Sequence, residues 1–371
     1  MKVIIAAAGT GGHINPGIAI ANKIMNEEKD SEIIFIGTNR GLENDLVPRA
    51  GYELKTIEAY GLSKKISIDN IKKMIKTYKG IGQAKNIVRD FKPDIVIGTG
   101  GYICGPTILA AMKYKIPTLL HESNAFPGKA VQMLSKKVDA VLVGFEDAKK
   151  SLLNAKNVIV TGTPIKIKKI EFSISEKNKI LNSIGLNAFK PVVLVFGGSQ
   201  GAKKINDSML EIIQKKLNNN YQIIWAAGPK QYDILKQDLA SKNVNVDKIE
   251  NVKILPYIYN MEEVMNVADL IVARSGAMTV SEISNLGKPA IFIPLPNVSN
   301  TLQMYNAKVL EKAGSAYILN DNELNGNLLN TNIQKMISNQ SLLKQMAKNA
   351  LICAKYDVEN KIYNEIKKII K

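Results

Sequence analysis

Four times along this chain, a short run of mostly apolar residues ends in a glycine-containing turn and is followed by apolar residues at helical spacing. The runs are VIIAAAGTGG from Val3, IVIGTGGY from Ile95, VVLVFGGSQG from Val192 and LIVARSGA from Leu270. Short apolar strands that alternate with helices are typical of parallel sheets covered on both faces. The alternation therefore predicts an α/β protein, and further runs such as EIIFIG, TLLHE, YQIIWAAG and AIFIPLP extend it through most of the chain.

The length of the chain predicts more than one domain. With 371 residues and 46% hydrophobic side chains, the sequence can fill two cores. A lysine-rich, apolar-poor link at Lys166–Lys179 separates the halves, and a short terminal helix with Ile362, Ile366 and Ile369 on one face follows the last strand. Having no strand after it, that helix is free to pack back on the first domain. The predicted segments are 1–164, 165–350 and 351–371.

The charge of the chain favours anionic partners. The sequence has 50 Lys and Arg against 33 Asp and Glu, a net charge of +17, which favours phosphates, nucleic acid or an acidic lipid surface. Its two cysteines, Cys104 and Cys353, lack metal-ligand spacing, which predicts a reducing compartment and neither a disulfide framework nor a zinc site. The first apolar run is too short for a signal peptide, and no run approaches the roughly 18 apolar residues of a transmembrane helix. We therefore expect a protein of the cytosol or of the cytosolic face of a membrane.

The stretch 270–307 predicts a binding site for a nucleotide sugar. A helix that begins near Ala277 directs free backbone N–H groups and the positive end of its dipole toward the strand ends, where a diphosphate fits. Glu282, about one and a half turns further, can accept hydrogen bonds from the hydroxyls of a ribose. Gln303 and Asn306 follow the next strand and carry amides that can both donate to and accept from a sugar. The alternative is a generic strand, helix and strand unit with a solvated Glu282.

The glycine turns do not match the common nucleotide-binding signatures. A dinucleotide site has the pattern G-x-G-x-x-G, followed about 20 residues later by an acid for the ribose. Here Ile14 stands where the third glycine belongs, and the second strand ends in Gly37-Thr38-Asn39 without an acid. The sequence also lacks a Walker A pattern and an Asp-x-Asp pair that could hold a metal on a diphosphate. These features argue against a dehydrogenase and a P-loop enzyme and favour metal-independent chemistry.

Five motifs identify a family resemblance. They are GTGGHINP from Gly9, GTGGYICGP from Gly98, HESNAFPG from His121, GGSQGA from Gly197, and RSGAMTVSEI from Arg274 with a downstream Gln303. In this order they resemble the MurG family of glycosyltransferases. The resemblance implies two Rossmann-like domains whose parallel sheets face a central cleft, the GT-B type. It also implies inverting transfer of GlcNAc from UDP-GlcNAc to the 4-hydroxyl of MurNAc in lipid I, which forms lipid II for peptidoglycan, without a metal or a cofactor.

The resemblance further implies partners and a location. It assigns acceptor and membrane binding to the N-terminal domain and UDP-GlcNAc binding to the C-terminal domain. It implies a peripheral enzyme on the cytoplasmic side of the cell membrane, whose candidate partners are lipid I, the anionic membrane surface and the cell wall and division machinery.

The motif matches also assign individual contacts. They place the first glycine loop near the donor diphosphate and the acceptor, Asn124 on the donor sugar, the backbone of Ile258 on the uracil, Glu282 on the ribose and Gln303 on the GlcNAc hydroxyls. The donor-binding residues implied in this way are Thr10, Gly11, Gly12, Asn124, Lys166, Ser199, Ile258, Ala277, Met278, Thr279, Val280, Ser281, Glu282 and Gln303. The implied acceptor-side loop contains Gly100, Gly101 and Tyr102.

Two positions depart from the family pattern. Lys166 stands where the family usually has an arginine, so the charge is kept and the bidentate fork is lost. Residues 300–302 replace a polar run that commonly precedes the glutamine, which leaves the local sugar contacts open.

A displacement at an anomeric carbon needs a base for the acceptor hydroxyl and stabilisation of the leaving UDP. The sequence offers only two histidines, His13 and His121, each beside a predicted site loop. His13 directly follows a glycine turn at the end of a strand, which favours it as the base. Glu122 is the competing candidate, and His121 is expected to anchor its loop. A purely structural role for either histidine is the alternative.

A basic stretch predicts contact with the membrane. Between Lys64 and Lys92 lie nine Lys or Arg against two Asp, a local net charge of +7. Ile68, Ile71, Met74, Ile75 and Tyr78 are interleaved with them at helical spacing. Such a basic amphipathic helix suits an anionic leaflet, whereas a surface helix with its apolar stripe on the core is the alternative. Nucleic acid is not expected, because aromatic interleaving and a recognised nucleic-acid module are both missing.

Two other functions fit parts of the sequence. A UDP-GlcNAc 2-epimerase has a similar two-domain build, and a non-catalytic nucleotide-sugar binding protein would need only the donor site. Transfer to a lipid-linked acceptor distinguishes both from a transferase.

Overall fold

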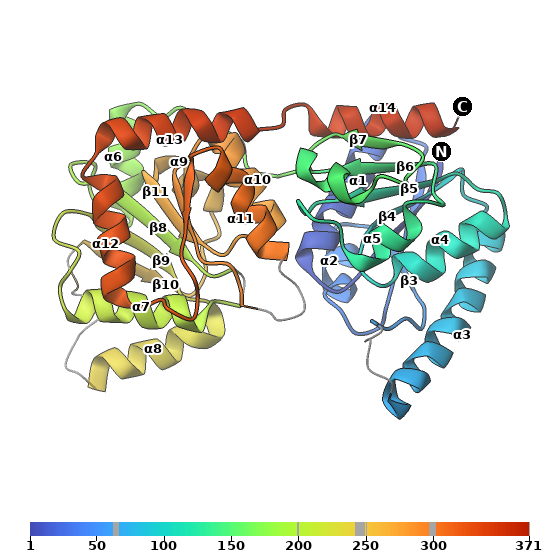
Figure 1. Cartoon of the computed structure of the whole chain (residues 1–371), viewed down its shortest axis with the longest axis horizontal. Coiled ribbons are helices and arrows are strands. Elements are labelled where there is room, and N and C mark those ends of the chain that lie inside the picture. Colours follow the sequence, from blue (N-terminus) through green and yellow to red (C-terminus); the bar gives the residue numbers. More distant parts are fainter. Residues whose placement is uncertain (62–66, 199, 242–248, 250, 297–301, 371) are drawn as a thin grey trace. The chain divides into compact units, whose positions relative to one another are not determined.

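The computed structural model describes residues 1–61, 67–198, 200–241, 249, 251–296 and 302–370. Backbone contacts divide the chain into two compact units: unit 1 contains residues 1–165 and 355–371, and unit 2 contains residues 166–354. Each unit is an α/β layer structure, as the alternation of strands and helices predicts (Figure 1). Among the described helices, none is long and apolar enough to cross a bilayer.

Unit 1 contains a sheet of seven parallel strands in the order β3-β2-β1-β4-β5-β6-β7. The strands are β1 (Lys2–Ala7), β2 (Glu32–Gly37), β3 (Glu53–Thr56), β4 (Ile95–Gly100), β5 (Thr118–Glu122), β6 (Ala140–Val143) and β7 (Val158–Val160). The strand order reverses between β1 and β4, and ligands of open α/β sheets bind at the carboxyl ends of strands at such a point. Ala7 of β1 pairs with Gly100 of β4, so the first two glycine loops lie side by side there.

Helices cover both faces of this sheet. They are α1 (Gly11–Glu27), α2 (Glu43–Arg49), α3 (Ile68–Phe91), α4 (Cys104–Lys113), α5 (Lys129–Leu134), the 3-10 helix η1 (Glu146–Ser151) and α14 (Val358–Ile370). Successive residues of β1 enter different cores, because side chains alternate across a strand. Val3 and Ile5 pack with α1 and α14, whereas Ile4 and Ala6 pack with α3 and α4.

Helix α1 begins earlier than the sequence suggests. Asn15 and Pro16 resemble an N-cap and a first helical residue, but the helix starts at Gly11 and Pro16 lies inside it. The glycine loop supplies the first turn, since the backbone N–H groups of His13 and Ile14 both donate to Thr10 O, at 3.0 and 3.1 Å. Pro16 sits near enough to the start that its missing N–H removes only the bond to the carbonyl of Gly12.

The terminal helix α14 belongs to unit 1 and packs on α1, the arrangement that its isolated position in the sequence permits. Ile362 and Ile366 are buried in the core that α1 shares with the sheet. Tyr363 Oη and Lys367 Nζ donate to Glu28 Oε1 at 2.8 and 2.6 Å, which fixes the helix on the end of α1.

Unit 2 contains six parallel strands in the order β10-β9-β8-β11-β12-β13. They are β8 (Val192–Phe196), β9 (Gln222–Ala226), β10 (Val252–Leu255), β11 (Leu270–Ala273), β12 (Ala290–Phe292) and β13 (Ala316–Ile318). The order reverses between β8 and β11, and Phe196 pairs with Ala273 at their carboxyl ends. The third glycine loop and the Arg274-Ser275-Gly276 turn are therefore neighbours.

The helices of unit 2 include one within the predicted link. They are α6 (Ile174–Ser183), α7 (Lys203–Gln214), α8 (Pro229–Ser241), α9 (Met261–Val267), α10 (Ala277–Leu286), α11 (Leu302–Lys312), α12 (Gly326–Ile337) and α13 (Gln340–Cys353). The second half of the lysine-rich link at Lys166–Lys179 contains the start of α6. Ser173 and Glu176 form a reciprocal capping box there, a signal that the lysine-rich composition obscured.

Candidate functional site

The first glycine loop of unit 1 is hydrogen-bonded to a buried carboxylate, that of Glu43. Gly9 has a φ of +94°, which favours glycine, and its N–H donates to Glu43 Oε2 at 2.9 Å. Glu43 is fully buried, and its Oε1 accepts from Thr38 N at 3.0 Å and Thr38 Oγ1 at 2.7 Å. Burial opposes the charge of Glu43, but the hydrogen bonds from Gly9 and Thr38 outweigh it and lower the pKa. The carboxylate therefore stays ionised and fixes the start of the loop.

His13 lies between the two glycine loops of unit 1. Its Nδ1 is 3.1 Å from the carbonyl oxygen of Ala8, and since a carbonyl only accepts, Nδ1 carries the proton. The lone pair is then on Nε2, the arrangement that a general base requires. A Cβ at Gly100 would lie 2.4 Å from His13 Cδ2, so only glycine leaves room for the imidazole. Thr99 Oγ1 also donates to His13 O at 2.8 Å.

The remaining loop residues of unit 1 differ in exposure. Thr10 is exposed, and Gly11, Gly12 and His13 are half-buried. On the acceptor-side loop, Gly101 has a φ of +84° and Tyr102 is half-buried.

Glu122, the competing base candidate, is occupied by its own loop. Its Oε1 accepts from Asn124 N at 2.9 Å and Asn124 Nδ2 at 2.8 Å, and its Oε2 accepts from Gly128 N at 2.7 Å. Only 5% of Glu122 is exposed. His121 is wholly buried with Nε2 at 3.0 Å from Gly162 O, and burial lowers its pKa to about 4, so it is neutral. Glu122 therefore supports the loop that carries Asn124, whereas the hydrogen bond of His121 joins the end of β5 to the segment after β7.

Unit 2 has a pocket of about 590 Å³ at the carboxyl ends of β8 and β11. Helices α7 and α10 begin at this pocket, and neither has a side-chain cap on its first backbone N–H groups. Lys203 and Lys204 add positive charge from the first turn of α7, although Lys203 Nζ is paired with Asp207 at 2.8 Å. Two helix N-termini and two lysines suit a diphosphate.

Arg274 lines this pocket and connects the segments around it, a role that the sequence analysis did not predict. Its Nη1 forms an ion pair of 2.5 Å with Asp321 Oδ1 and donates to Ile293 O at 2.9 Å. Both charged side chains line the pocket and are mostly buried. Arg274, two residues before Gly276, was the available signal, whereas nothing local marks Asp321. Lys203 and Lys204 were also missed, and their signal is the lysine pair that follows Gly201.

Gln303 lines the pocket and Asn306 does not. Leu295 N donates to Gln303 Oε1 at 2.9 Å, which leaves the amide nitrogen of Gln303 to donate elsewhere. Asn306 is fully buried and its Nδ2 donates to Ser275 O at 3.2 Å, so this amide supports the turn instead of facing a sugar. Ser275 Oγ in turn donates to Gln303 O at 2.8 Å.

Glu282 is half-buried in α10 and has no hydrogen-bond partner among the residues that the structure describes. Burial raises its pKa to about 7. A carboxylate in this state, without a partner among the described residues, suits an acceptor for hydroxyl groups of a ligand.

The other implied donor residues vary in accessibility. Of the α10 residues, Thr279 lines the pocket, Met278 is half-buried, and Ala277, Val280 and Ser281 are buried. Ile258 is 2% exposed, which is compatible only with contacts through its backbone or a small part of its side chain. Lys166 is exposed. Ser199 lies outside the described residues, and across the described part of the chain no group of three or more His, Cys, Asp or Glu is arranged to hold a metal.

Comparison with known families matches both units. The glycosyltransferase family 28 N-terminal domain matches residues 3–143, and the family's C-terminal domain matches residues 192–362. A UDP-N-acetylglucosamine--N-acetylmuramyl-(pentapeptide) pyrophosphoryl-undecaprenol N-acetylglucosamine transferase from Thermoanaerobacter sp. (strain X514) is 43% identical, with 100% of both chains covered. The protein of the same name from Acetivibrio thermocellus is 42% identical over 100% of this chain and 99% of its own.

Solved structures also match the fold over nearly the whole chain. The crystal structure of Acinetobacter baumannii MurG matches with a TM-score of 0.78 at 28% identity, over 99% of each chain. The UDP-GlcNAc 2-epimerase from Neisseria meningitidis, bound to UDP-GlcNAc, matches with a TM-score of 0.66 at 17% identity, over 99% of this chain and 100% of its own. The second likeness concerns the fold alone.

Proposed function

Since this chain belongs to the MurG family within glycosyltransferase family 28, we infer that it catalyses the reaction for which its relatives are named. It transfers N-acetylglucosamine from UDP-N-acetylglucosamine to N-acetylmuramyl-(pentapeptide) pyrophosphoryl-undecaprenol and acts in peptidoglycan synthesis. The epimerase alternative is not favoured, because the likeness to epimerases is confined to the fold, whereas the transferases are alike in sequence over the whole chain.

The donor diphosphate is proposed to bind in the pocket of unit 2. The observation that carries this proposal is the pair of uncapped helix N-termini, α7 and α10, at one pocket with Lys203 and Lys204. These groups would stabilise the negative charge that grows on UDP as it leaves. Glu282 would accept from the ribose hydroxyls, the backbone of Ile258 would read the uracil, and the Gln303 amide would donate to the GlcNAc hydroxyls.

His13 is proposed as the general base. Its Nε2 would take the proton of the acceptor 4-hydroxyl while the oxygen attacks the anomeric carbon, and the bond to UDP would break with inversion. The hydrogen bond from Nδ1 to Ala8 O supports this assignment, because it fixes the tautomer. Glu122 is the weaker candidate, since both of its oxygens already accept hydrogen bonds.

The first half of α3 is proposed to contact an anionic membrane surface on the cytoplasmic side. Ile68, Ile71, Met74, Ile75 and Tyr78 are each at least half exposed. The buried residues of the helix, Gly80, Ala84 and Val88, lie in its second half, and Ala84 and Val88 belong to the core beside the sheet. The alternative, a surface helix whose apolar stripe packs on the core, therefore describes the second half of α3. It does not describe the first half, where exposed apolar and basic side chains are mixed.

The transferase function is tested by incubating the protein with radiolabelled UDP-GlcNAc and a lipid I analogue. We expect labelled lipid II and one UDP per transfer. Production of UDP-ManNAc without transfer would indicate an epimerase, and binding of UDP-GlcNAc without release of UDP on addition of acceptor would indicate a binding protein.

A further inference from the structure

Unit 2 has a second pocket, of about 460 Å³, at the amino ends of its strands, whereas the donor pocket lies at their carboxyl ends. It lies where β8, β11 and β12 begin, and Pro191, Asp269 and Pro289 directly precede these strands. Helix α10 runs from one pocket to the other, since Thr279 lines the first and Gly287, just after the helix, lines the second. The two pockets are therefore separate, and the proposed transferase reaction does not use the second.

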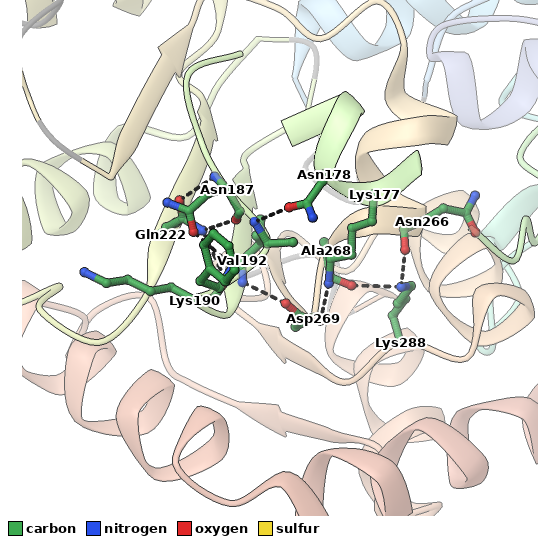
Figure 2. Close-up of polar contacts among 12 residues, drawn as sticks. Lys177, Asn178, Asn187, Lys190, Val192, Gln222, Asn266, Ala268, Asp269 and Lys288 are labelled. Carbon is green, nitrogen blue, oxygen red and sulfur yellow. Dashed lines mark hydrogen bonds and ion pairs between the residues drawn. The ribbon is translucent and has the colours of Figure 1, made fainter. Parts of the chain in front are cut away.

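The second pocket has an excess of positive charge. Lys177, Lys190, Lys288 and Lys344 line it, against the single carboxylate of Asp269. That carboxylate is fully engaged: Oδ1 is paired with Lys177 Nζ at 2.9 Å, and Oδ2 accepts from Val192 N at 2.8 Å (Figure 2). No second acid among the lining residues neutralises the other three lysines.

Lys288 places a half-buried ammonium group in the wall of this pocket. Its Nζ donates to Asn266 O at 2.6 Å and Ala268 O at 2.8 Å, and these carbonyls supply no negative charge (Figure 2). Burial lowers the pKa of Lys288 to about 8, against the attraction of Asp269 and with a further contribution from Lys177 and Lys169. A bound anion would supply the missing counter-charge.

Apolar side chains form a second part of the pocket lining. Phe189 is 90% exposed beside Lys190, although a large aromatic side chain ordinarily buries its ring. Pro191, Pro289 and Leu343 form further apolar wall. This combination of a flat apolar surface and several ammonium groups resembles the lining of sites that hold an organic anion.

We propose that this second pocket is a binding site for an organic phosphate with a planar ring, of the nucleotide class, whose phosphates contact Lys288, Lys190 and Lys344 and whose ring lies on Phe189. The volume of the pocket is within the range of about 300 to 1,000 Å³ found for small-molecule sites. The ligand would bind independently of the donor, because none of these side chains lines the donor pocket.

The test uses ADP as the probe and isothermal titration calorimetry on the full chain with UDP-GlcNAc in excess, so that the donor pocket is filled. We expect ADP to bind, and the double variant Lys190→Glu/Lys344→Glu to weaken binding at least tenfold. The control is Lys236→Glu/Lys348→Glu, which changes the same charge at two exposed lysines outside the pocket lining. We expect the control to keep the affinity within twofold and both variants to keep transferase activity.

Inorganic pyrophosphate tests the ring. We expect it to bind at least fivefold more weakly than ADP, and Phe189→Ala to remove that difference. Absence of ADP binding to the donor-filled protein would overturn the site, and an equal loss in the two double variants would reduce it to a general charge effect. Pyrophosphate binding as tight as that of ADP would overturn the ligand class. The ADP and pyrophosphate titrations contain no acceptor, so their outcomes do not depend on whether the transferase reaction is the proposed one.

Discussion

Glu43 Oε2 lies 2.9 Å from the backbone nitrogen of Gly9, and this hydrogen bond joins the first turn of α2 to the loop that precedes His13. The same carboxylate holds Thr38 at the end of β2 through its other oxygen. The position of His13 therefore depends on a buried acid that does not itself face the ligand-binding side of the loop.

Replacing Glu43 with Gln should slow transfer. The amide offers one acceptor where the carboxylate offers two, so either Gly9 or Thr38 loses its partner. We expect kcat to fall by about 10- to 100-fold through misplacement of the loop, and the free energy of unfolding to fall by about 1 to 3 kcal/mol. The pKa of Glu43 is lowered on folding. The difference in free energy of unfolding between wild type and Glu43→Gln should therefore be largest at neutral pH and decrease as the pH falls through the folded pKa.

The matched control for Glu43 is Asp45→Asn, on the exposed side of the same helix. It should leave both kcat and unfolding unchanged. If Glu43→Gln loses stability and keeps full kcat, the carboxylate has no part in positioning His13.

Replacing His13 with Asn should remove the general base. We expect kcat to fall by about 10² to 10⁴-fold while the affinity for UDP-GlcNAc stays within threefold of wild type, as measured by initial rates and by calorimetry. A decrease in kcat smaller than tenfold would contradict His13 as the base and favour Glu122. The kcat of Glu122→Gln, measured under the same conditions, would then distinguish the two candidates.

Glu282 should make stability depend on pH. Its folded pKa of about 7 lies above the usual 4.5, so the folded state binds more protons and loses stability as the pH rises between these values. The glutamine side chain in the Glu282→Gln variant carries no charge. The free energy of unfolding of this variant, relative to that of the wild type, should therefore rise by about 3 kcal/mol between pH 4 and pH 8. Urea denaturation at both pH values measures this, and a constant difference would show that the carboxylate is not desolvated.

The ribose contact of Glu282 needs a separate measurement. With Glu282→Ala, we expect the KM for UDP-GlcNAc to rise, and 2′-deoxyribose and 3′-deoxyribose donors to lose less activity than they do with wild type. Loss of a charged hydrogen bond corresponds to about 1.5 to 3 kcal/mol. Equal penalties for the deoxy donors in both proteins would exclude the ribose contact.

Transfer should survive EDTA. Helix N-termini and lysines supply positive charge at the donor pocket, so the leaving diphosphate can be stabilised without a divalent ion. Rates with EDTA and with added Mg²⁺ or Mn²⁺ test this. Complete loss that either metal restores would contradict it, whereas mild stimulation would not, because UDP itself binds divalent ions.

Charge reversal on α3 should weaken membrane binding. Lys72, Lys76 and Lys79 are exposed among the apolar residues of its first half. At roughly 1 kcal/mol per basic residue near an anionic surface, changing all three to Glu should lower binding to phosphatidylglycerol vesicles by about 100-fold or more, most strongly at low salt. Lys73 is left unchanged, because it is already paired with Asp69 on the same helix.

The control for α3 reverses Lys29, Lys136 and Lys137, which are exposed elsewhere in unit 1. It makes the same change in net charge and should affect vesicle binding much less. Turnover of a water-soluble lipid I analogue should be preserved in both triple variants. Persistent vesicle binding in the α3 variant would exclude this surface.

The sequence predicts local features well and distant ones poorly. The helix within the basic stretch 64–92 and the start of α10 follow from apolar periodicity and turn residues, which are local signals. The hydrogen bond from Gly9 to Glu43 spans 34 residues, and it arises only because β1 and β2 pair in parallel. The ion pair of Arg274 and Asp321 likewise depends on how β11 and the loop after β13 meet. Asn306 was wrongly predicted to face a sugar. It is a polar residue close to the site in the sequence, but its side chain is buried and supports a turn.

Because α14 belongs to unit 1, the first half of the chain does not contain all of its own core. Val358, Ile362 and Ile366 close the apolar surface formed by α1 and the sheet, and they are the last part of that core to leave the ribosome. Unit 2, by contrast, is a single continuous segment. During synthesis the second unit can therefore complete its fold first, while the apolar face of unit 1 stays uncovered until α14 has been made.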